Sequence, residues 1–297
     1  MLRIIKGLLP AGGLQGLEVE GMEDKVNGAP IGRPKGESAT SPPPPKTWGV
    51  LERIIGIFLR PAETFRAVKT HPTWLIAFLL SAVLATAVQF VYLVRVPYPM
   101  RREADFERIV KIARKSGMSP QDEQEFRREY DRQTQRGETW LQKLVGLVYV
   151  PINLLLVLVI GAGLYQLGAL LVKERLAFKH ALAVRAYAEL PPTVILSLFL
   201  IIQMYLRPPE EVVGHKGLLL GNLGFLVEDK DAHVILATIA SNLDLFQFWS
   251  LVWAALGLSI MLERAKWGVA VGIAGGVWLL GLLAKVAINS LSGVVIV

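Results

Sequence analysis

Two charged residues and two prolines open an apolar run in the stretch "RAYAELPPTVI", residues 185–195. Arg185 and Glu189 are four positions apart, so a helix places them on one face, where they can form an ion pair. Pro191 and Pro192 lack backbone donors, and a helix tolerates this best in its first turn. We therefore expect "FKHALAVRAYAE" to form an interfacial helix that turns into the membrane at the proline pair, with both charges near the inner interface.

Three further polar side chains lie in or beside apolar runs, namely Gln89, Asp244 and Lys285. On insertion scales a charge in lipid costs about 3 kcal/mol unless it finds water, a partner or the interface. Lys285 is expected to reach the outer surface, and the alternative is a pairing with Asp244. If these three residues converged with Glu189 near the middle of the bilayer, they would form a polar path for a small solute or ion.

The motifs of common enzymes and metal sites are missing from the sequence. The histidines never fall three or four positions apart, and HExxH, GxxxxGK[ST] and GxSxG do not occur. The chain also contains no cysteine, which excludes disulfides and thiolate chemistry. We therefore predict a protein that is not an enzyme, with no catalytic residues, no cofactor and no metal site.

The composition is that of an integral membrane protein. Of the 297 residues, 53% are hydrophobic and only 19% are charged. The apolar residues also gather in long runs, whereas a soluble core scatters them at helical or strand period. The net charge of +7 is assigned to contact with anionic headgroups and not to nucleic acid, because the basic residues flank the apolar runs.

Five apolar segments approach the roughly 20 residues that a helix needs to cross a bilayer. They show no sustained alternation of the kind that barrel strands require. The sequence thus predicts an all-α polytopic membrane protein with five transmembrane helices plus interfacial and extramembrane helices. The predicted spans are about 74–96, 144–172, 190–206, 245–262 and 267–288.

The chain divides into a tail and a membrane domain. Proline and glycines interrupt the weak apolar run at the start of the chain, and residues 22–46 hold little apolar surface and four consecutive prolines. We therefore expect a disordered Pro-rich tail over residues 1–46, followed by a membrane domain over residues 47–297. The two very short connections, "VKERLAFKH" and "ERAKW", are basic. Since basic short loops stay inside, this pattern favours a cytoplasmic N-terminus.

Two segments outside the spans are expected to be helical. Residues 47–74 fit an amphipathic helix in the headgroup plane, and a second short helix after Pro61 is expected to present Phe65 to the bilayer. These helices either contact lipids and partners or simply anchor the chain. Residues 101–140 fit a charged helical hairpin outside the membrane, which serves as a docking surface or as a solvated spacer.

Three glycines recur at four-residue steps in the last span: Gly268, Gly272 and Gly276. Such a stripe lets another helix approach closely. We expect packing within the bundle, and the alternative is self-association through this face.

Several motifs together resemble those of bacterial Yip-domain proteins, relatives of the Ypt/Rab-interacting proteins of eukaryotic secretory membranes. "IFLRPAETFRAVKTHPTW" resembles the FxxPxxTF…PxW segment of that family, and "VRAYAELPPTVI" looks like its A/YxYAxxP element. "LDLFQFWSLVWAALGLSIMLERAKW" is similar to its stretch in which Phe and Trp lead into LxxxGLS. The likeness covers about residues 48–290 and marks Phe246, Trp249 and Gly257 as family-patterned positions, together with Glu189 and Pro191.

The resemblance implies a five-span helical domain in a bacterial cytoplasmic membrane. Eukaryotic members act in vesicle traffic with prenylated small GTPases, but this chain lacks their DLYGP-type motif, so GTPase binding does not carry over. The expected function is a non-enzymatic scaffold or adaptor whose partners are membrane lipids, other membrane proteins or a second copy of itself. The alternative is a transporter, although five spans cannot divide into two equal repeats.

Overall fold

The computed structural model describes residues 48–135, 137–213, 218, 221–227, 230, 232–263, 266–292 and 295. The tail expected at residues 1–46 lies outside these residues. Throughout the described part of the chain the regular structure is helical, and no β-strand is present. The prediction of an all-α fold is therefore confirmed.

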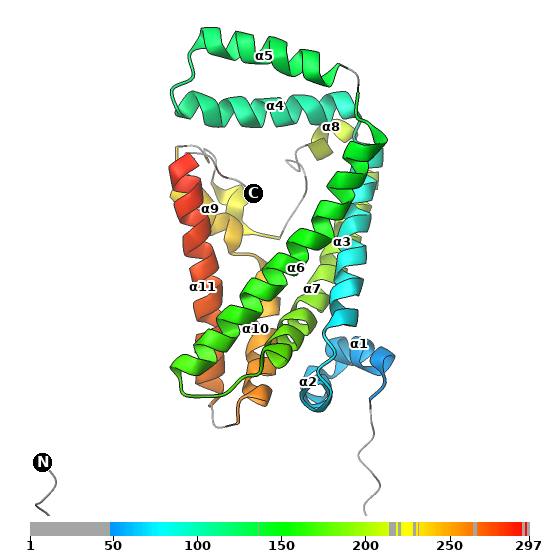
Figure 1. Cartoon of the computed structure of the whole chain (residues 1–297), viewed down its shortest axis with the longest axis vertical. Helices are drawn as coiled ribbons and strands as arrows, with labels where there is room; N and C mark the ends of the chain where they lie inside the picture. The colour runs from blue at the N-terminus through cyan, green and yellow to red at the C-terminus, as the bar shows by residue number, and fades with distance from the viewer. Residues whose placement is uncertain are drawn as a thin grey trace, which may run out of the picture. The chain divides into compact units, whose positions relative to one another are not determined.

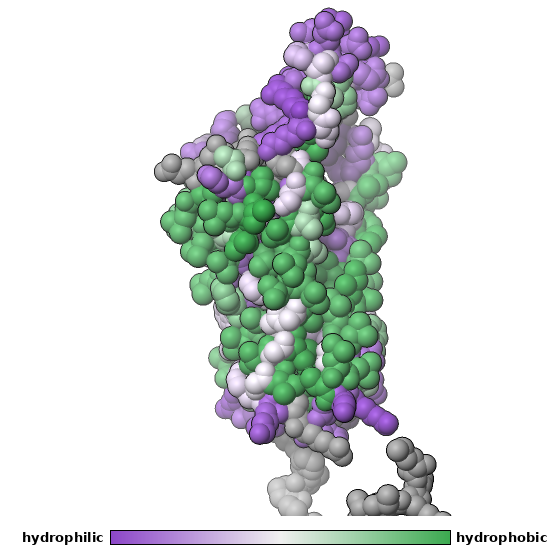
Figure 2. Space-filling view, turned by 90° about the vertical axis from the view of Figure 1, so that its left-hand side faces the viewer, coloured by the Kyte–Doolittle hydropathy of each residue, from purple (hydrophilic) through white to green (hydrophobic). Residues whose placement is uncertain are grey.

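Five apolar helices build the bundle: α3 (Leu75–Arg95), α6 (Trp140–Leu171), α7 (Phe178–Leu206), α10 (Leu245–Met261) and α11 (Trp267–Ser292). Four of them are long and apolar enough to cross a membrane, and α10 is shorter, with 17 residues. That length is at the lower limit of about 17 residues for a span. Figure 2 shows hydrophobic side chains covering one face of the bundle between polar ends, which confirms a polytopic membrane protein.

Helix α7 is the centre of the bundle. It packs against α3, α6 and α10, while α11 packs against α10 and more weakly against α6. Figure 1 shows α6 crossing the bundle diagonally, from beside the upper part of α3 to the lower end of α11. The described core clusters mainly where α2, α6, α7, α10 and α11 meet.

The expected corner at the proline pair is wrong. Helix α7 runs without interruption from Phe178 to Leu206, with Pro191 and Pro192 inside it. Both prolines are buried. Neighbouring helices hold the segment on several sides, and such packing lets a bundle helix tolerate prolines that would break an isolated one. The segment assigned to the interface is therefore the first part of a single long helix.

Two short helices, α1 (Val50–Leu59) and α2 (Pro61–Thr70), lie at one end of the bundle (Figure 1). The buried Arg53 fixes them to the start of the first span. Its guanidinium donates to the carbonyl of Trp48 at 2.9 and 3.1 Å, to the carbonyl of His71 at 3.0 Å and to Thr73 Oγ1 at 2.8 Å. These contacts make α1, α2 and the segment before α3 one unit.

Phe65 does not face the bilayer, contrary to expectation. Its side chain is fully buried, and its ring would lie 2.8 Å from a Cβ added at Gly257 of α10. Only glycine leaves this space, so α2 packs closely on α10 through the aromatic ring. The face of α2 that carries Phe65 therefore contacts the bundle and not the lipid.

A charged hairpin formed by α4 (Tyr98–Lys115) and α5 (Pro120–Thr134) lies at the other end of the bundle (Figure 1). Ser119 and Asp122 form a capping box at the start of α5. Phe106 stacks on Phe126, with ring centroids 5.7 Å apart, and Arg127 lies over the Phe106 ring. The remaining elements at this end are α8 (Pro209–Val212), η2 (Leu223–Leu226) and α9 (Val234–Asn242).

Candidate functional site

Four side chains from three helices form a polar cluster inside the bundle, which we call the polar cluster: Tyr165, Arg185, Glu189 and Ser250. Arg185 Nη2 pairs with Glu189 Oε1 at 2.9 Å, and Arg185 Nη1 donates to the Tyr165 hydroxyl at 3.2 Å. The Ser250 hydroxyl donates to Glu189 Oε2 at 2.8 Å. The cluster thus joins α6, α7 and α10 through charge-assisted hydrogen bonds.

The members of the polar cluster lie inside their helices. Glu189 is about 16 Å along α7 from Phe178, and Ser250 is about 16 Å along α10 from Met261 and about 8 Å from Leu245. Phe178 and Met261 both adjoin charged connections beside α2. The turn that was expected to keep both charges beside these connections is absent, because α7 is continuous through Pro191 and Pro192.

A glycine on α6 leaves space for the guanidinium. A Cβ added at Gly161 would lie 3.2 Å from Arg185 Nε. The buried face of α7 around the ion pair is rich in alanine, including Ala181, Ala186 and Ala188. Small side chains let the helices approach closely enough for Arg185 to reach the Tyr165 hydroxyl.

Asp244 and Lys285 lie in a separate polar group near the opposite end of α10. Asp244 caps α10 by accepting a hydrogen bond from the Phe246 amide at 2.7 Å. Lys285 Nζ donates to Asn242 Oδ1 at 2.7 Å, and its charge is near enough to attract that of Asp244. The sequence offered two alternatives for Lys285, namely reaching the outer surface or pairing with Asp244. The structure shows a protein partner, but its hydrogen bond goes to Asn242.

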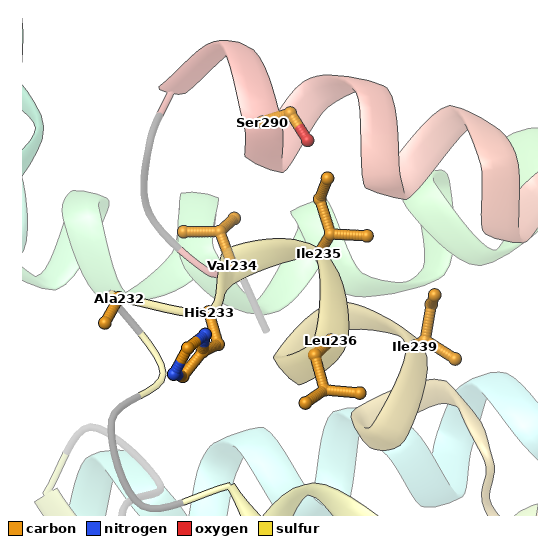
Figure 3. A pocket seen from close by; sticks show the side chains of 7 residues that line it. All are labelled: Ala232, His233, Val234, Ile235, Leu236, Ile239 and Ser290. Atoms are coloured by element: carbon orange, nitrogen blue, oxygen red, sulfur yellow. The ribbon is translucent and has the colours of Figure 1, made fainter.

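The structure does not bring the four polar candidates together. Gln89 is half-buried on α3, Glu189 belongs to the polar cluster, and Asp244 and Lys285 form the separate group. The described residues do form a hollow of about 550 Å³. Figure 3 shows that its lining comes from Ala232, His233, the first turns of α9 and Ser290 of α11. None of the four candidates lines it, and the described residues gather no group of three or more potential metal ligands.

The comparison with protein families decides the relationship that the sequence motifs indicated. The model of the Yip1 domain matches residues 55–288, which include the bundle and the polar cluster. The chain belongs to the Yip1 domain family. No curated protein and no solved structure matches it. It is thus an integral membrane protein with a Yip1 domain.

The three positions on and near α10 that the Yip1 motifs mark have different surroundings. Gly257 is where α10 meets α2 and α7, because a Cβ there would be 2.8 Å from the Phe65 ring and 2.9 Å from Val184. Trp249 is half-buried and meets Trp253 edge to face at 6.1 Å. The ring of Phe246 is half-buried and lies beside Gly221. These contacts are packing contacts, so the motif of the Yip1 domain reports the fit of α10 in the bundle.

The glycine stripe of α11 does not pack within the described part of the bundle. Gly268, Gly272 and Gly276 are exposed, and an added Cβ would meet no described atom within 4 Å at any of them. The close approach of α11 is made instead at Gly168 of α6, where a Cβ would lie 2.7 Å from Ile273. Periodicity alone could not show which face of α11 turns inward.

Sequence reasoning missed Tyr165 and Ser250, which complete the polar cluster. Each is a polar residue in an otherwise apolar span, at positions where aromatic and small residues are common. The available signal was the cost of leaving Arg185 and Glu189 without further partners in the membrane. That cost predicts hydrogen-bonding residues on adjacent helices, but not which helices are adjacent.

Proposed function

We propose that this Yip1-domain protein is a non-enzymatic membrane scaffold that binds lipids and other membrane proteins through α1 and α2. The observation that carries the proposal is an apolar ridge on α1, formed by Leu51, Ile55 and Leu59, which are 71%, 50% and 75% exposed. They recur at four-residue steps, so they share one face of the helix. A helix that shows such a face at the membrane surface lies in the headgroup layer or against a partner.

The ridge is held rigidly. Trp253 of α10 donates its indole N–H to the Ile57 carbonyl at 3.0 Å, and Lys69 Nζ donates to the Ile260 carbonyl at 2.8 Å. Together with the contacts of Arg53, these bonds connect α1 and α2 to the spans. A rigid surface loses less conformational entropy on binding, which suits it to holding partners in place.

The charge distribution supports a cytoplasmic location for this end, in a bacterial cytoplasmic membrane. Its exposed basic residues outnumber its acidic ones, which favours the inner leaflet. The exposed basic residues are Arg60, Arg66, Lys69, Lys173, Arg175, Lys179 and Lys266, and the exposed acidic residues are Glu52, Glu63 and Glu263, with Glu174 half-buried.

The separation of the polar candidates counts against the alternative of a transporter. A polar path needs Gln89, Glu189 and Lys285 to share one route, and they belong to different contacts. Small-GTPase binding is not part of the proposal, because the motif associated with it is absent from the chain.

Photo-crosslinking in native membranes tests the scaffold. A photoreactive amino acid at Ile55 on the ridge is compared with the same group at Val83, which is 64% exposed on the side of α3. We expect mass spectrometry to recover a reproducible membrane-protein partner from Ile55 and not from Val83. Recovery of no reproducible protein from Ile55, or of the same proteins from both sites, would count against the proposal.

A further inference from the structure

The polar cluster is not fully covered by protein. Helices enclose Arg185 and Glu189 on most sides, yet 23% and 31% of their side chains remain accessible. On the side of a bundle of membrane-spanning helices, such accessible parts would otherwise meet lipid. Contact of a charge with hydrocarbon is unfavourable by about 2.5–3.5 kcal/mol on insertion scales, so a polar group is expected to cover them.

Hydrogen-bonding capacity remains on the positive side of the cluster. A guanidinium has five N–H donors. Arg185 donates to Tyr165 and forms an ion pair with Glu189, and its other N–H groups have no acceptor among the described residues. Tyr165 is only 1% exposed, so it holds the guanidinium from inside the bundle and leaves the outward donors of Arg185 for a ligand. These free donors suit an oxyanion such as a phosphate.

The negative side of the cluster limits which oxyanion fits. Glu189 pairs with Arg185 through one carboxylate oxygen and accepts from Ser250 through the other, and lone pairs remain on both oxygens. A phosphate alone would be attracted by Arg185 and repelled by the adjacent carboxylate. A ligand that carries an ammonium beside its phosphate satisfies both charges.

We propose that the polar cluster binds the headgroup of a zwitterionic phospholipid with a primary ammonium, its phosphate at Arg185 and its ammonium at Glu189. A primary ammonium donates hydrogen bonds to a carboxylate, whereas a quaternary one cannot. The chemistry therefore favours phosphatidylethanolamine over phosphatidylcholine. This site is distinct from the ridge on α1, and it stands if the scaffold proposal fails.

Native mass spectrometry of the purified full chain tests the site. The protein is titrated with equal amounts of phosphatidylethanolamine, phosphatidylcholine and phosphatidylglycerol. We expect one phosphatidylethanolamine to be retained at least about five-fold over either competitor, a difference of about 1 kcal/mol. Equal retention of all three, or preference for the anionic lipid, would overturn the assignment.

A double variant locates the binding. Arg185→Met/Glu189→Met replaces the pair by apolar side chains, a change that buried ion pairs often tolerate. It is expected to lose the lipid preference, whereas Arg127→Met/Glu103→Met, which removes an ion pair of the hairpin, is expected to keep it. Preference retained in the first variant would place the lipid elsewhere and refute the proposal.

Cysteine labelling provides a second test of the headgroup site, which can be used if the double variant does not fold. Thr193 is one turn beyond Glu189 on the same face of α7, whereas Ile195 is exposed on another face. Because the chain has no cysteine, single Thr193→Cys and Ile195→Cys variants can be compared directly with a charged methanethiosulfonate. In nanodiscs, phosphatidylethanolamine is expected to slow labelling at position 193 several-fold relative to phosphatidylcholine, with no change at position 195. The same rate in both lipids at position 193 would contradict a bound headgroup.

The source of the headgroup is tested with soluble phosphoethanolamine. At millimolar concentration it should leave the retained lipid in place, because it lacks the acyl chains that hold the headgroup against the bundle. Displacement of the lipid by the soluble compound would overturn the assignment to a membrane lipid.

Discussion

Ser250 of α10 donates a hydrogen bond to Glu189 of α7 at 2.8 Å, on the carboxylate oxygen that does not pair with Arg185. The contact fixes α10 against α7, the central helix of the bundle. Glu189 thus meets a cation of its own helix on one oxygen and a hydroxyl of α10 on the other. The polar cluster is therefore a charged connection between helices inside the bundle.

Glu189→Gln is expected to destabilise the protein more than removal of the whole ion pair. The single change leaves Arg185 with an uncompensated charge in the bundle. The expected loss is about 1–3 kcal/mol, below the 3–5 kcal/mol of fully buried pairs because the side chains are partly accessible. Thermal unfolding in detergent measures this. A Glu189→Gln variant that is as stable as Arg185→Met/Glu189→Met would contradict the prediction.

Gly257→Ala and Gly272→Ala provide a matched pair. A Cβ at Gly257 would meet the Phe65 ring at 2.8 Å and Val184 at 2.9 Å, so we expect a loss of about 1–3 kcal/mol from overpacking. A Cβ at Gly272 meets no described atom within 4 Å, so alanine there should be neutral or stabilise by up to about 1 kcal/mol through helix propensity.

The same unfolding assay in dilute detergent compares the two glycine variants. Strong destabilisation by Gly272→Ala would show that another helix occupies that face, as self-association through the stripe would require. Equal stability of the two variants would contradict the contact between Phe65 and Gly257.

Arg53→Met is expected to release α1 locally. The guanidinium makes four hydrogen bonds, two to the Trp48 carbonyl before α1 and two that join α1 to His71 and Thr73 before α3, and methionine can make none of them. Amide hydrogen exchange of Val50–Leu59 should accelerate about ten-fold or more, while exchange in α7 should stay unchanged. Arg60→Met is the control, because Arg60 is exposed and pairs only with Glu63 at 3.6 Å among the described residues. Comparable acceleration in both variants would refute the role of Arg53.

The pKa of Glu123 in the hairpin is lowered by its hydrogen bond from Arg114, whose Nε lies 2.7 Å from the carboxylate. The folded pKa is below the unfolded one, so the pair stabilises the hairpin fully at pH values above the ordinary carboxyl pKa of about 4.3. This stabilisation is lost as the pH falls through the folded pKa. Carboxyl NMR should show Glu123 titrating below that value in the native chain. Arg114→Gln should raise the titration midpoint, and an unchanged midpoint would contradict the pairing.

The pKa of Asp105 in the same hairpin shifts in the opposite direction, because desolvation by burial raises it. A raised folded pKa means that the folded hairpin binds the proton more tightly, so this group favours the folded state as the pH falls. On acidification the hairpin should therefore lose less stability than the titration of Glu123 alone would cause. An Asp105→Asn variant lacks the unfavourable charged form, so in acid titrations followed by circular dichroism it should be more stable than the native chain at neutral pH and lose stability more steeply as the pH falls. A variant less stable than the native chain at neutral pH would contradict this sign.

The fold was more predictable than the site because lipid imposes a length and a composition on each span. Long apolar runs gave helices near their expected places, and Pro61 did separate two short helices. The course of α7 was not predictable from its prolines, because burial by neighbouring helices decides whether a proline pair ends a helix. The orientation of Phe65 was missed for the same reason, since the space at Gly257 comes from a helix almost 200 positions away.

The site was predicted only in its first half. The four-residue spacing of Arg185 and Glu189 indicated an ion pair, and the structure has it at 2.9 Å. Tyr165 and Ser250 come from other helices, so their contacts depend on how α6 and α10 pack on α7. The glycine stripe of α11 shows the reverse case, in which a clear pattern has no partner among the described residues.

The continuity of α7 is the central claim, because it makes the segment with Arg185 and Glu189 part of the same straight helix as the span after the prolines. Spin labels on Lys179→Cys and Leu206→Cys, both at exposed positions, measure it in the cysteine-free chain by pulsed electron resonance in nanodiscs. A continuous helix predicts a separation of about 40 Å between the two backbone positions. A right-angle turn at the prolines would shorten it to about 30 Å, and that result would contradict the account.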